Sequence, residues 1–410
     1  MTEAAGPQGA GGGLLEGVRV LDLTNVLSGP FCCYQLALLG ADVIKVEVPG
    51  TGDLARRLGA SPDLNDALMG ASFLAQNAGK RSITVDLKTP GGKRVFERLV
   101  ATADVVVENF RPGVMDRLGF GHAALEAIKP GIVLCSVSGF GQDGPLRFRP
   151  AYDQIIQGLA GVMSVTGDAE SAPLRVGYPV ADTIGGLTAA FAIAAALVRR
   201  GRTGKGETID VSMLEATLVT MGWAVSNWLI AGVPAAPMGN RNMTAAPSGT
   251  FRTGDGPLNV AANRQEQFEA LVEVVGRPDL ARDPRFAERE ARKRNRDALT
   301  VELETALAAR SARDWAERLN ARGVPAGEVL SVMDVLDHPQ VTSRGLVHDF
   351  DAVPGLDRPV RVVRSGFRLQ SGDPQPSGPP PRLGEHTAEI LAELGFRDSE
   401  IAALSAEKAV

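Results

Sequence analysis

Cysteine, histidine and aromatic residues are scarce in this sequence of 410 residues, which contains three cysteines, four histidines, three tryptophans and three tyrosines. Cys32 and Cys33 are adjacent and Cys135 lies far from them, so their spacing fits neither a disulfide framework nor a zinc site. None of the histidines stands in a recognisable catalytic motif. We therefore expect no metal site, and the cysteine usage suits a reducing compartment, the cytoplasm.

No excess of one charge is present either, because acidic and basic residues are interspersed and the net charge is −5. Such a balance lacks the basic footprint of a nucleic-acid-binding protein. Residues 1–13 lack the basic start and apolar core of a secretory signal, and we expect a disordered tail there. The apolar run over residues 187–198 is too short to span a membrane and predicts a buried helix.

Strand and helix signals alternate over the first 150 residues. Short apolar, β-branched runs are separated by helical stretches near residues 30–39 and 92–102. The runs that we expect to form strands cover residues 18–23, 42–47, 82–87, 104–108 and 131–138. This alternation is typical of parallel βαβ units, so the sequence predicts an α/β protein with a Rossmann-like, doubly wound parallel sheet.

The second half of the chain does not continue this regular alternation of strand and helix signals. Residues 14–200 form the predicted large domain, and the turn-rich G-R-T-G-K-G-E opens a predicted linker over residues 201–236. Amphipathic helices follow a short strand within residues 237–325, which predicts a smaller α+β domain. Residues 326–410 contain a strand pair, the Pro-rich S-G-P-P-P-R-L and two short helices.

Two carboxylates, Asp153 of R-P-A-Y-D and Asp182 of V-A-D-T-I-G-G, lie in apolar and Gly-rich surroundings. An unperturbed Asp has a pKa of about 3.9 and is ionised at neutral pH. Asp182 could therefore attack an activated acyl group without a general base. An Asp before a helix is also a favoured N-cap, and Asp153 is equally compatible with a solvated acid at a helix start, so both readings stay open.

Basic residues follow the expected carboxyl ends of strands: Lys88, Arg111 and Arg117. In an open parallel sheet, ligands bind at that edge, and several cations there suit a ligand with phosphates. After the first strand, T-N-V-L-S-G-P contains the single glycine Gly29 instead of G-x-G-x-x-G, which argues against a nicotinamide dinucleotide.

A series of motifs that starts at about Leu14 and runs to the C-terminus resembles the class III coenzyme A transferases, the CaiB/BaiF or formyl-CoA-transferase-like family. The motifs that carry this resemblance include L-D-L-T-N-V-L-S-G-P, D-V-V-V-E-N-F-R-P-G, R-P-A-Y-D, T-G-K-G-E-T-I-D-V-S-M-L-E-A and L-G-E-H-T, all in the family's order. The resemblance implies an interlocked homodimer of ring-shaped chains. It also implies that residues 326–410 return to complete the large domain.

The resemblance also implies site residues. Asp182 matches the acyl-accepting aspartate, and we assign Tyr152 and Asp153 to its positioning. The expected coenzyme A contacts are Val26, Leu27, Val85, Asp86, Leu87, Lys88, Asn109, Phe110, Arg111 and Arg117. Val48 stands where relatives often have a basic residue, and Leu27 where the formate–oxalate enzyme has Gln. We expect no tightly bound cofactor; acyl-CoA and a small carboxylic acid, such as oxalate, formate or succinate, are the implied substrates.

Two alternatives remain. The α-methylacyl-CoA racemases of the same superfamily need a His before the acid of R-P-x-x-D, where this chain has Tyr152, a phenol whose usual pKa near 10 makes it a poor base. The other alternative is a CoA-binding protein without catalytic activity. For a transferase, main-chain N–H groups of residues 139–141, Gly239 and residues 248–249 are candidate oxyanion donors.

Overall fold

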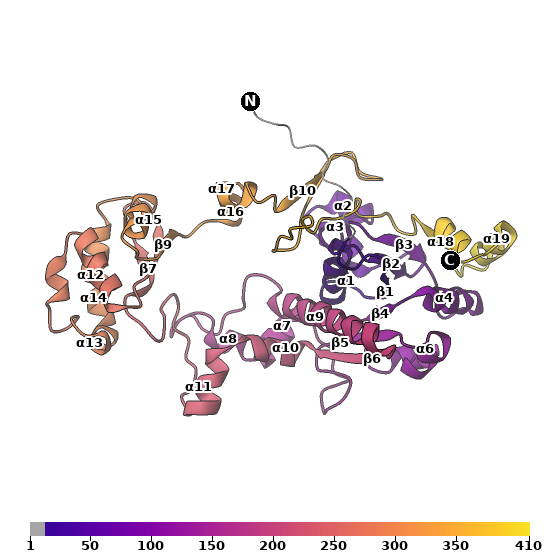
Figure 1. The fold of residues 1–410 in the computed structure, drawn as a ribbon, viewed down its shortest axis with the longest axis horizontal. Helices are drawn as coiled ribbons and strands as arrows, with labels where there is room; N and C mark the ends of the chain where they lie inside the picture. Colours follow the sequence, from indigo (N-terminus) through magenta and orange to yellow (C-terminus); the bar gives the residue numbers. More distant parts are fainter. Residues whose placement is uncertain (1–12) are drawn as a thin grey trace. The chain divides into compact units, whose positions relative to one another are not determined.

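The computed structural model describes residues 13–410 and divides the chain into two compact units (Figure 1). The first unit runs up to Val162, resumes over Val176–Gly232 and ends with Thr342–Val410. The second unit combines Met163–Arg175 with Val233–Val341. The tail predicted over residues 1–13 lies outside the described residues, apart from Gly13.

A six-stranded parallel sheet in the order β3-β2-β1-β4-β5-β6 forms the centre of the first unit. Its strands are β1 (Arg19–Asp22), β2 (Asp42–Glu47), β3 (Arg81–Thr84), β4 (Val105–Glu108), β5 (Val133–Ser138) and β6 (Glu207–Ser212). The order reverses between β1 and β4, as in doubly wound nucleotide-binding sheets. The predicted α/β class and Rossmann-like parallel sheet are thus confirmed.

Helices cover both faces of this sheet, which explains why its central strands are continuous apolar runs. On one face, Leu21, Ile44 and Val106 pack with helices α4 (Pro90–Thr102), α6 (His122–Ile128), α18 (Thr387–Glu393) and α19 (Asp398–Ala406). On the other face, Val20 and Val43 pack with α1 (Ser28–Leu38), α7 (Asp153–Leu159), α9 (Val180–Thr203) and α10 (Met213–Thr220). The end of the chain, yellow in Figure 1, therefore completes the core begun by its first strands.

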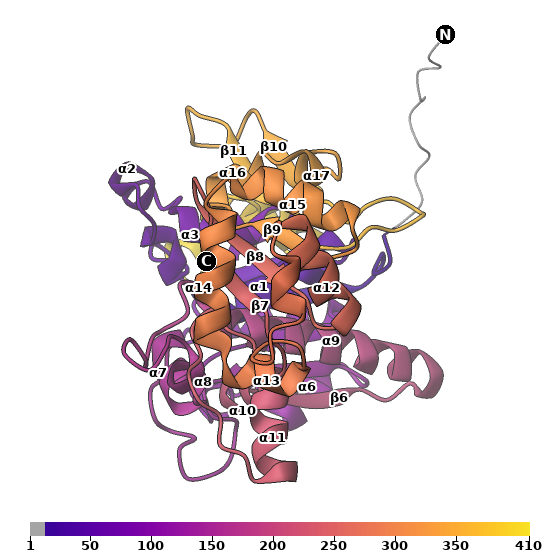
Figure 2. The same cartoon turned by 90° about the vertical axis from the view of Figure 1, so that its left-hand side faces the viewer.

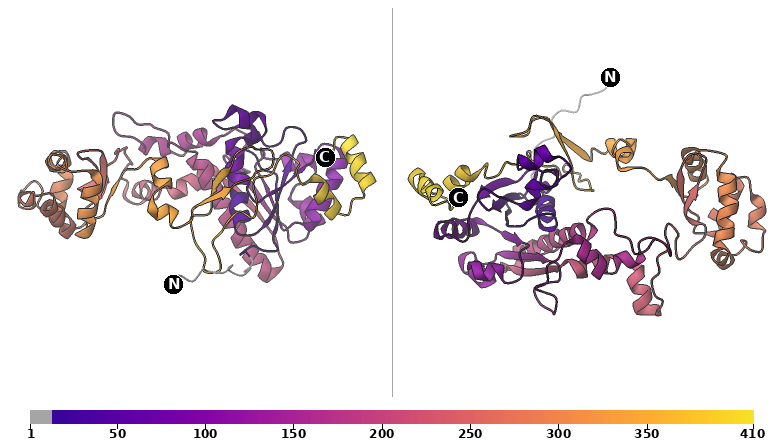
Figure 3. Two further views of the ribbon diagram at one scale, coloured as in Figure 1. Left: turned by 90° about the horizontal axis from the view of Figure 1, so that it is seen from above. Right: turned by 180° about the vertical axis from the view of Figure 1, so that it is seen from behind.

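The second unit contains a three-stranded antiparallel sheet and a helical layer, seen from two sides in Figures 2 and 3. Its sheet is formed by β7 (Ser248–Arg252), β8 (Pro257–Ala261) and β9 (Ala326–Glu328), and its main helices are α12 (Gln265–Val274), α13 (Arg289–Arg294), α14 (Arg296–Leu307) and α15 (Ala312–Ala321). Phe268, Leu303 and Trp315 are buried between these elements. This unit has an apolar core of its own.

Shorter elements connect these parts. They are η1 (Leu54–Arg57), α2 (Pro62–Asp66), α3 (Ala71–Asn77), α5 (Val114–Leu118), α8 (Val162–Val165), α11 (Trp223–Ala231), η2 (Pro278–Ala281), α16 (Val332–Leu336), α17 (Pro339–Thr342), β10 (Val347–Phe350) and β11 (Val360–Val363).

Residues 201–236, predicted as a linker, contain β6, α10 and α11 instead. The Gly-rich turn misled the prediction, because Ile209 and Val211 directly after it alternate as a strand and pack into the core beneath α9. Residues 326–341 belong to the second unit, because β9 pairs with β8. Strand pairing therefore assigns β6 to the first unit and β9 to the second.

Helix α9 is longer and less buried than predicted. It spans 24 residues and is, within residues 13–410, the one helix long and apolar enough to cross a membrane by length and composition, a weak criterion that core helices also meet. One side packs on α1, where a Cβ added to Gly186 would meet the Ser28 carbonyl oxygen at 2.5 Å. Phe191, by contrast, is 76% exposed.

Buried ion pairs fix the loops at the carboxyl end of the sheet. Lys80 Nζ donates to Asp22 Oδ2 at 2.8 Å, and Lys45 Nζ lies 3.0 Å from Asp53 Oδ2, all with fully buried side chains. Burial alone would raise the pKa of Asp22, but Lys45 and Lys80 lower it to about 2. Asp53 Oδ1 in turn accepts the Val26 N–H at 2.9 Å, which ties the loop after β1 to this network.

Replacing Lys45 by methionine should lower the free energy of unfolding by about 3–5 kcal/mol, because Asp53 loses its buried cation and Asp22 one of two. Urea denaturation followed by tryptophan fluorescence and circular dichroism measures this change. The exposed Lys205→Met is the matched control and should leave the midpoint unchanged. Equal stability of the Lys45→Met variant and the unaltered protein would contradict the role of the network.

Candidate functional site

A cavity of about 260 Å³ opens in the first unit. It is lined by residues 25–28, 109–112, 137–139, 147, 149–152, 182 and 213. The first segment lies in the loop after β1, the second directly follows β4 and the third contains the end of β5. The cavity therefore lies at the carboxyl edge of the sheet, where the strand order reverses. This is the edge at which open α/β sheets bind ligands.

Asp182 lines this cavity from the first turn of α9. The helix begins at Val180 with Pro179 as the N-cap residue, so Asp182 is not the cap that its sequence position suggested. Across residues 13–410, no hydrogen bond to its carboxylate is present. Both oxygens are thus available to a ligand.

Asp153, the first residue of α7, performs the capping instead. Its Oδ1 accepts the main-chain N–H of Ala181 at 2.9 Å and lies 3.4 Å from the N of Asp182. Its Oδ2 accepts from Gln157 Nε2 at 2.7 Å, and Gln157 Oε1 accepts the Val176 N–H at 2.9 Å. Asp153 therefore holds the start of α9, and with it Asp182, from a neighbouring helix.

Burial raises the pKa of Asp182 to about 7, and the negative charge of Asp153 adds to the shift. The expectation that Asp182 is fully ionised at neutral pH is therefore wrong for the free protein. A carboxylate with a raised pKa is poorly solvated and more basic, and such shifts are common at catalytic sites. Once ionised, a poorly solvated carboxylate is in general a better nucleophile than an exposed one.

Tyr152 lines the same cavity next to Asp153 and is 65% exposed. Within the described part of the chain, its hydroxyl has no hydrogen-bond partner. The ring therefore stands at the cavity wall, free to contact a ligand, and its positioning role remains a prediction.

Half of the predicted coenzyme A contacts meet at this cavity: Val26, Leu27, Asn109, Phe110 and Arg111. Asn25 donates its N–H to Asn109 Oδ1 and accepts from Asn109 Nδ2, both at 2.8 Å, which joins the loops after β1 and β4. Val26 has a φ of 68°, a conformation that is strained for a β-branched residue. The two loops are thus held in one arrangement.

The other predicted contacts, Val85, Asp86, Leu87, Lys88 and Arg117, do not line this cavity. Val85 is 2% exposed in the core, so its side chain cannot reach a ligand. Sequence reasoning also missed Arg147 and Arg149, which do line the cavity. Their position just before Tyr152 in R-F-R-P-A-Y-D was the available signal.

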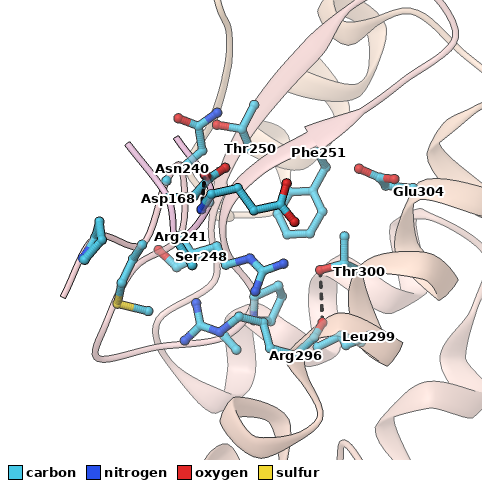
Figure 4. A pocket seen from close by; sticks show the side chains of 18 residues that line it. Asp168, Asn240, Arg241, Ser248, Thr250, Phe251, Arg296, Leu299, Thr300 and Glu304 are labelled. Atoms are coloured by element: carbon cyan, nitrogen blue, oxygen red, sulfur yellow. Dashed lines mark hydrogen bonds between the residues drawn. The ribbon is translucent and has the colours of Figure 1, made fainter. Parts of the chain in front are cut away.

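A second cavity, of about 580 Å³, lies wholly within the second unit (Figure 4). Several of its charged side chains are already paired: Arg241 with Asp297 at 2.7 Å, and Glu304 with Arg252 at 2.8 Å. Gly239 lines it, but its N–H donates to the Gly167 carbonyl at 2.6 Å and is not free for an oxyanion.

The candidate oxyanion donors of the first unit also differ from one another. The N–H of Gly141 donates to Ser138 Oγ at 2.9 Å, whereas Gly139 lines the Asp182 cavity. Gly139 is therefore the candidate that the arrangement favours.

Comparisons with known proteins identify the family of the chain. Residues 15–387 match the family model described as CoA-transferase family III. The chain is 41% identical over 389 residues to the acetyl-CoA:oxalate CoA-transferase of Acetobacter aceti (95% of this chain, 97% of that protein) and 37% identical to the succinate–glutarate CoA-transferase of Agrobacterium fabrum (93% and 95%). A crystal structure of a CAIB/BAIF family protein from Brucella suis has a TM-score of 0.83 and 37% identity, covering 94% of this chain and all of that one.

We expect Asp182 to titrate near pH 7, and Asp153→Asn to lower that pKa because the neighbouring negative charge is removed. Carboxyl carbon-13 NMR of labelled aspartate measures both values, with Asp182→Asn identifying the signal. Titration of Asp182 near 3.8, the ordinary pKa of an aspartate, would contradict the expected burial.

The same shift predicts a pH-dependent stability. An acid whose pKa is raised on folding destabilises the folded state progressively as pH rises from its unfolded pKa of 3.8 to its folded value of about 7. Asp182→Asn should therefore be more stable than the unaltered protein above pH 7. That difference should shrink as the pH falls toward 4, as thermal denaturation at a series of pH values would show.

Proposed function

This chain belongs to CoA-transferase family III, and we propose that Asp182 is the nucleophile through which it moves CoA from an acyl-CoA to a free carboxylic acid. That the protein is a CoA-transferase acting on carboxylates follows from the family and its relatives. The observation that supports Asp182 is its place as the sole acid among the residues lining the cavity of about 260 Å³, with no hydrogen bond to its oxygens from any residue within 13–410.

The chemistry needs four acyl transfers. The Asp182 carboxylate attacks the thioester carbonyl, CoA thiolate leaves, and a mixed anhydride forms. The thiolate then attacks the aspartyl carbonyl, which gives an aspartyl-CoA thioester and releases the donor acid. The acceptor carboxylate attacks this thioester, and the expelled thiolate attacks the acyl carbonyl of the new anhydride, which yields the product acyl-CoA and restores Asp182.

The surroundings of Asp182 suit this series of reactions. Burial weakens the solvation of the attacking carboxylate, and CoA kept bound throughout holds the thiolate close to each carbonyl. The Gly139 N–H is the proposed oxyanion donor, and Asp153 is a positioning residue that acts through the first turn of α9.

Short mono- or dicarboxylic acids are the proposed acceptors. This proposal is supported by the relatives, whose names specify oxalate, succinate and glutarate. The α-methylacyl-CoA racemase alternative remains weaker, because a base is needed where this chain has the phenol of Tyr152.

We also propose that two chains associate as the interlocked homodimer that the family resemblance implies. The apolar side chains of Phe191 on α9 and of Trp228 and Ile230 on α11 are 76%, 58% and 86% exposed, and a second chain would cover them.

The mechanism predicts a covalent intermediate on one peptide. After incubation with acetyl-CoA and acid quenching, mass spectrometry should find an acyl or CoA adduct on the peptide that contains Asp182. Asp182→Asn should lose the adduct and at least about 1,000-fold of the transfer rate, because the nucleophile is gone. The exposed Asp66→Asn is the control and should keep both. Full transfer by Asp182→Asn would exclude the mechanism.

The reaction should also depend on pH with a defined sign. Because only ionised Asp182 attacks, kcat/KM for acyl-CoA should rise with pH and level off above an apparent pKa near 7. Asp153→Asn should move this rise to lower pH. A flat profile between pH 5 and pH 8 would show that Asp182 does not titrate there.

A further inference from the structure

Arg147 and Arg149 form a pair of cations on the wall of the Asp182 cavity. The intervening Phe148 does not line the cavity; the guanidinium of Arg147 lies 4.5 Å from the centre of its ring. Within residues 13–410, neither arginine side chain has a hydrogen bond or an ion pair. In the described part of the chain, two neighbouring exposed arginines without a paired anion therefore line the cavity.

The loop that carries them is fixed at both ends. At its start, the Gln142 N–H donates to Asp210 Oδ2 at 2.9 Å. At its end, Ala151 packs so closely on Gly139 that a Cβ added to Gly139 would lie 2.3 Å from the Cβ of Ala151. Asp153, two residues further on, binds the start of α9. The segment that contains the two arginines is thus anchored by contacts to β6, to Gly139 and, through Asp153, to the start of α9.

Within residues 13–410, neither arginine forms an ion pair with Asp182, although all three residues line the same cavity. The raised pKa of Asp182 agrees with this, because a guanidinium paired with a carboxylate lowers its pKa. A ligand with one carboxyl at Asp182 would need a second negative group to reach the arginines.

The size and charge of the cavity indicate what that ligand is. At about 260 Å³ it lies below the range typical of drug-sized ligands, which suits a small acid and the thioester end of CoA. Its lining contains three arginines and one acid, so it is electrostatically matched to anions. Arg111 is among the expected coenzyme A contacts, whereas Arg147 and Arg149 have no such expected role.

We propose that Arg147 and Arg149 bind the distal carboxylate of a dicarboxylic acid or its half-thioester, and thereby make the enzyme selective for dicarboxylic substrates. Arginine suits this role because its planar guanidinium binds carboxylates through two parallel hydrogen bonds. The inference rests on the proposed function, since the acyl group must reach Asp182. The same cations could instead bind CoA phosphates, which share the anionic chemistry.

The test compares substrates with and without a distal carboxylate. Succinyl-CoA is matched with acetyl-CoA as donor, and glutarate with butyrate as acceptor, in full-length protein. Arg147→Gln, Arg149→Gln and the double variant should raise KM about tenfold or more for succinyl-CoA and glutarate, because a charged hydrogen-bonding partner is lost. KM for acetyl-CoA and butyrate should stay unchanged. Arg282→Gln, an exposed arginine of the second unit, is the control.

Each outcome decides the inference. Lysine at both positions should recover part of the dicarboxylate selectivity, which a merely structural defect would not allow, and unchanged thermal midpoints should accompany the KM changes. Equal KM increases for acetyl-CoA and succinyl-CoA would overturn the inference in favour of phosphate binding. Unchanged KM for all four substrates would also overturn it. Failure of the proposed function is distinguishable, because then the unaltered protein itself would form no adduct at Asp182.

Discussion

The carboxylate of Asp153 receives the main-chain N–H groups at the start of α9, and the placement of Asp182 depends on that contact. Asp153 thus makes the structural hydrogen bonds, and within the described residues the carboxylate of Asp182 makes none. The same proximity contributes to the raised pKa of Asp182, after the larger contribution of burial. Geometry and reactivity of the site therefore have a common physical origin in two acids on adjacent helices.

The buried lysines at the carboxyl end of the sheet, in contrast to Asp182, are paired with opposite charges. Lys45 and Lys80 are fully buried, but Lys45 pairs with Asp22 and Asp53 and Lys80 pairs with Asp22, so the charges compensate one another. Such networks stabilise little in net terms, yet they are costly to break and they specify one arrangement of the loops above them. Among the described residues, by contrast, no cation pairs with Asp182. The buried lysines pair with the carboxylates of Asp22 and Asp53 in the scaffold and not with the candidate nucleophile.

The sequence was sufficient to predict the sheet, because β-branched runs such as that of residues 104–108 are unambiguous when both faces are covered. It also singled out Asp182. It could not show that the Asp153 side chain accepts the N–H groups at the start of α9, because Asp153 and Asp182 are 29 positions apart in the sequence and meet only in the folded chain. For the same reason the pKa of Asp182 was misjudged. Residues 201–236 were misread because local turn chemistry hid a strand whose partner, β5, lies about 70 residues earlier.

The backbone of Val26, which lines the cavity, is linked to the buried ion pairs of the sheet. A β-branched residue at a φ of 68° carries about 1–3 kcal/mol of conformational strain, which persists only because surrounding contacts outweigh it. Its N–H is held by Asp53, whose other oxygen lies 3.0 Å from Lys45. Substitutions at positions 45 and 53 would therefore disturb the loop that contains Val26 as well as the core. These deeply buried sites should tolerate fewer exchanges than apolar neighbours of equal burial.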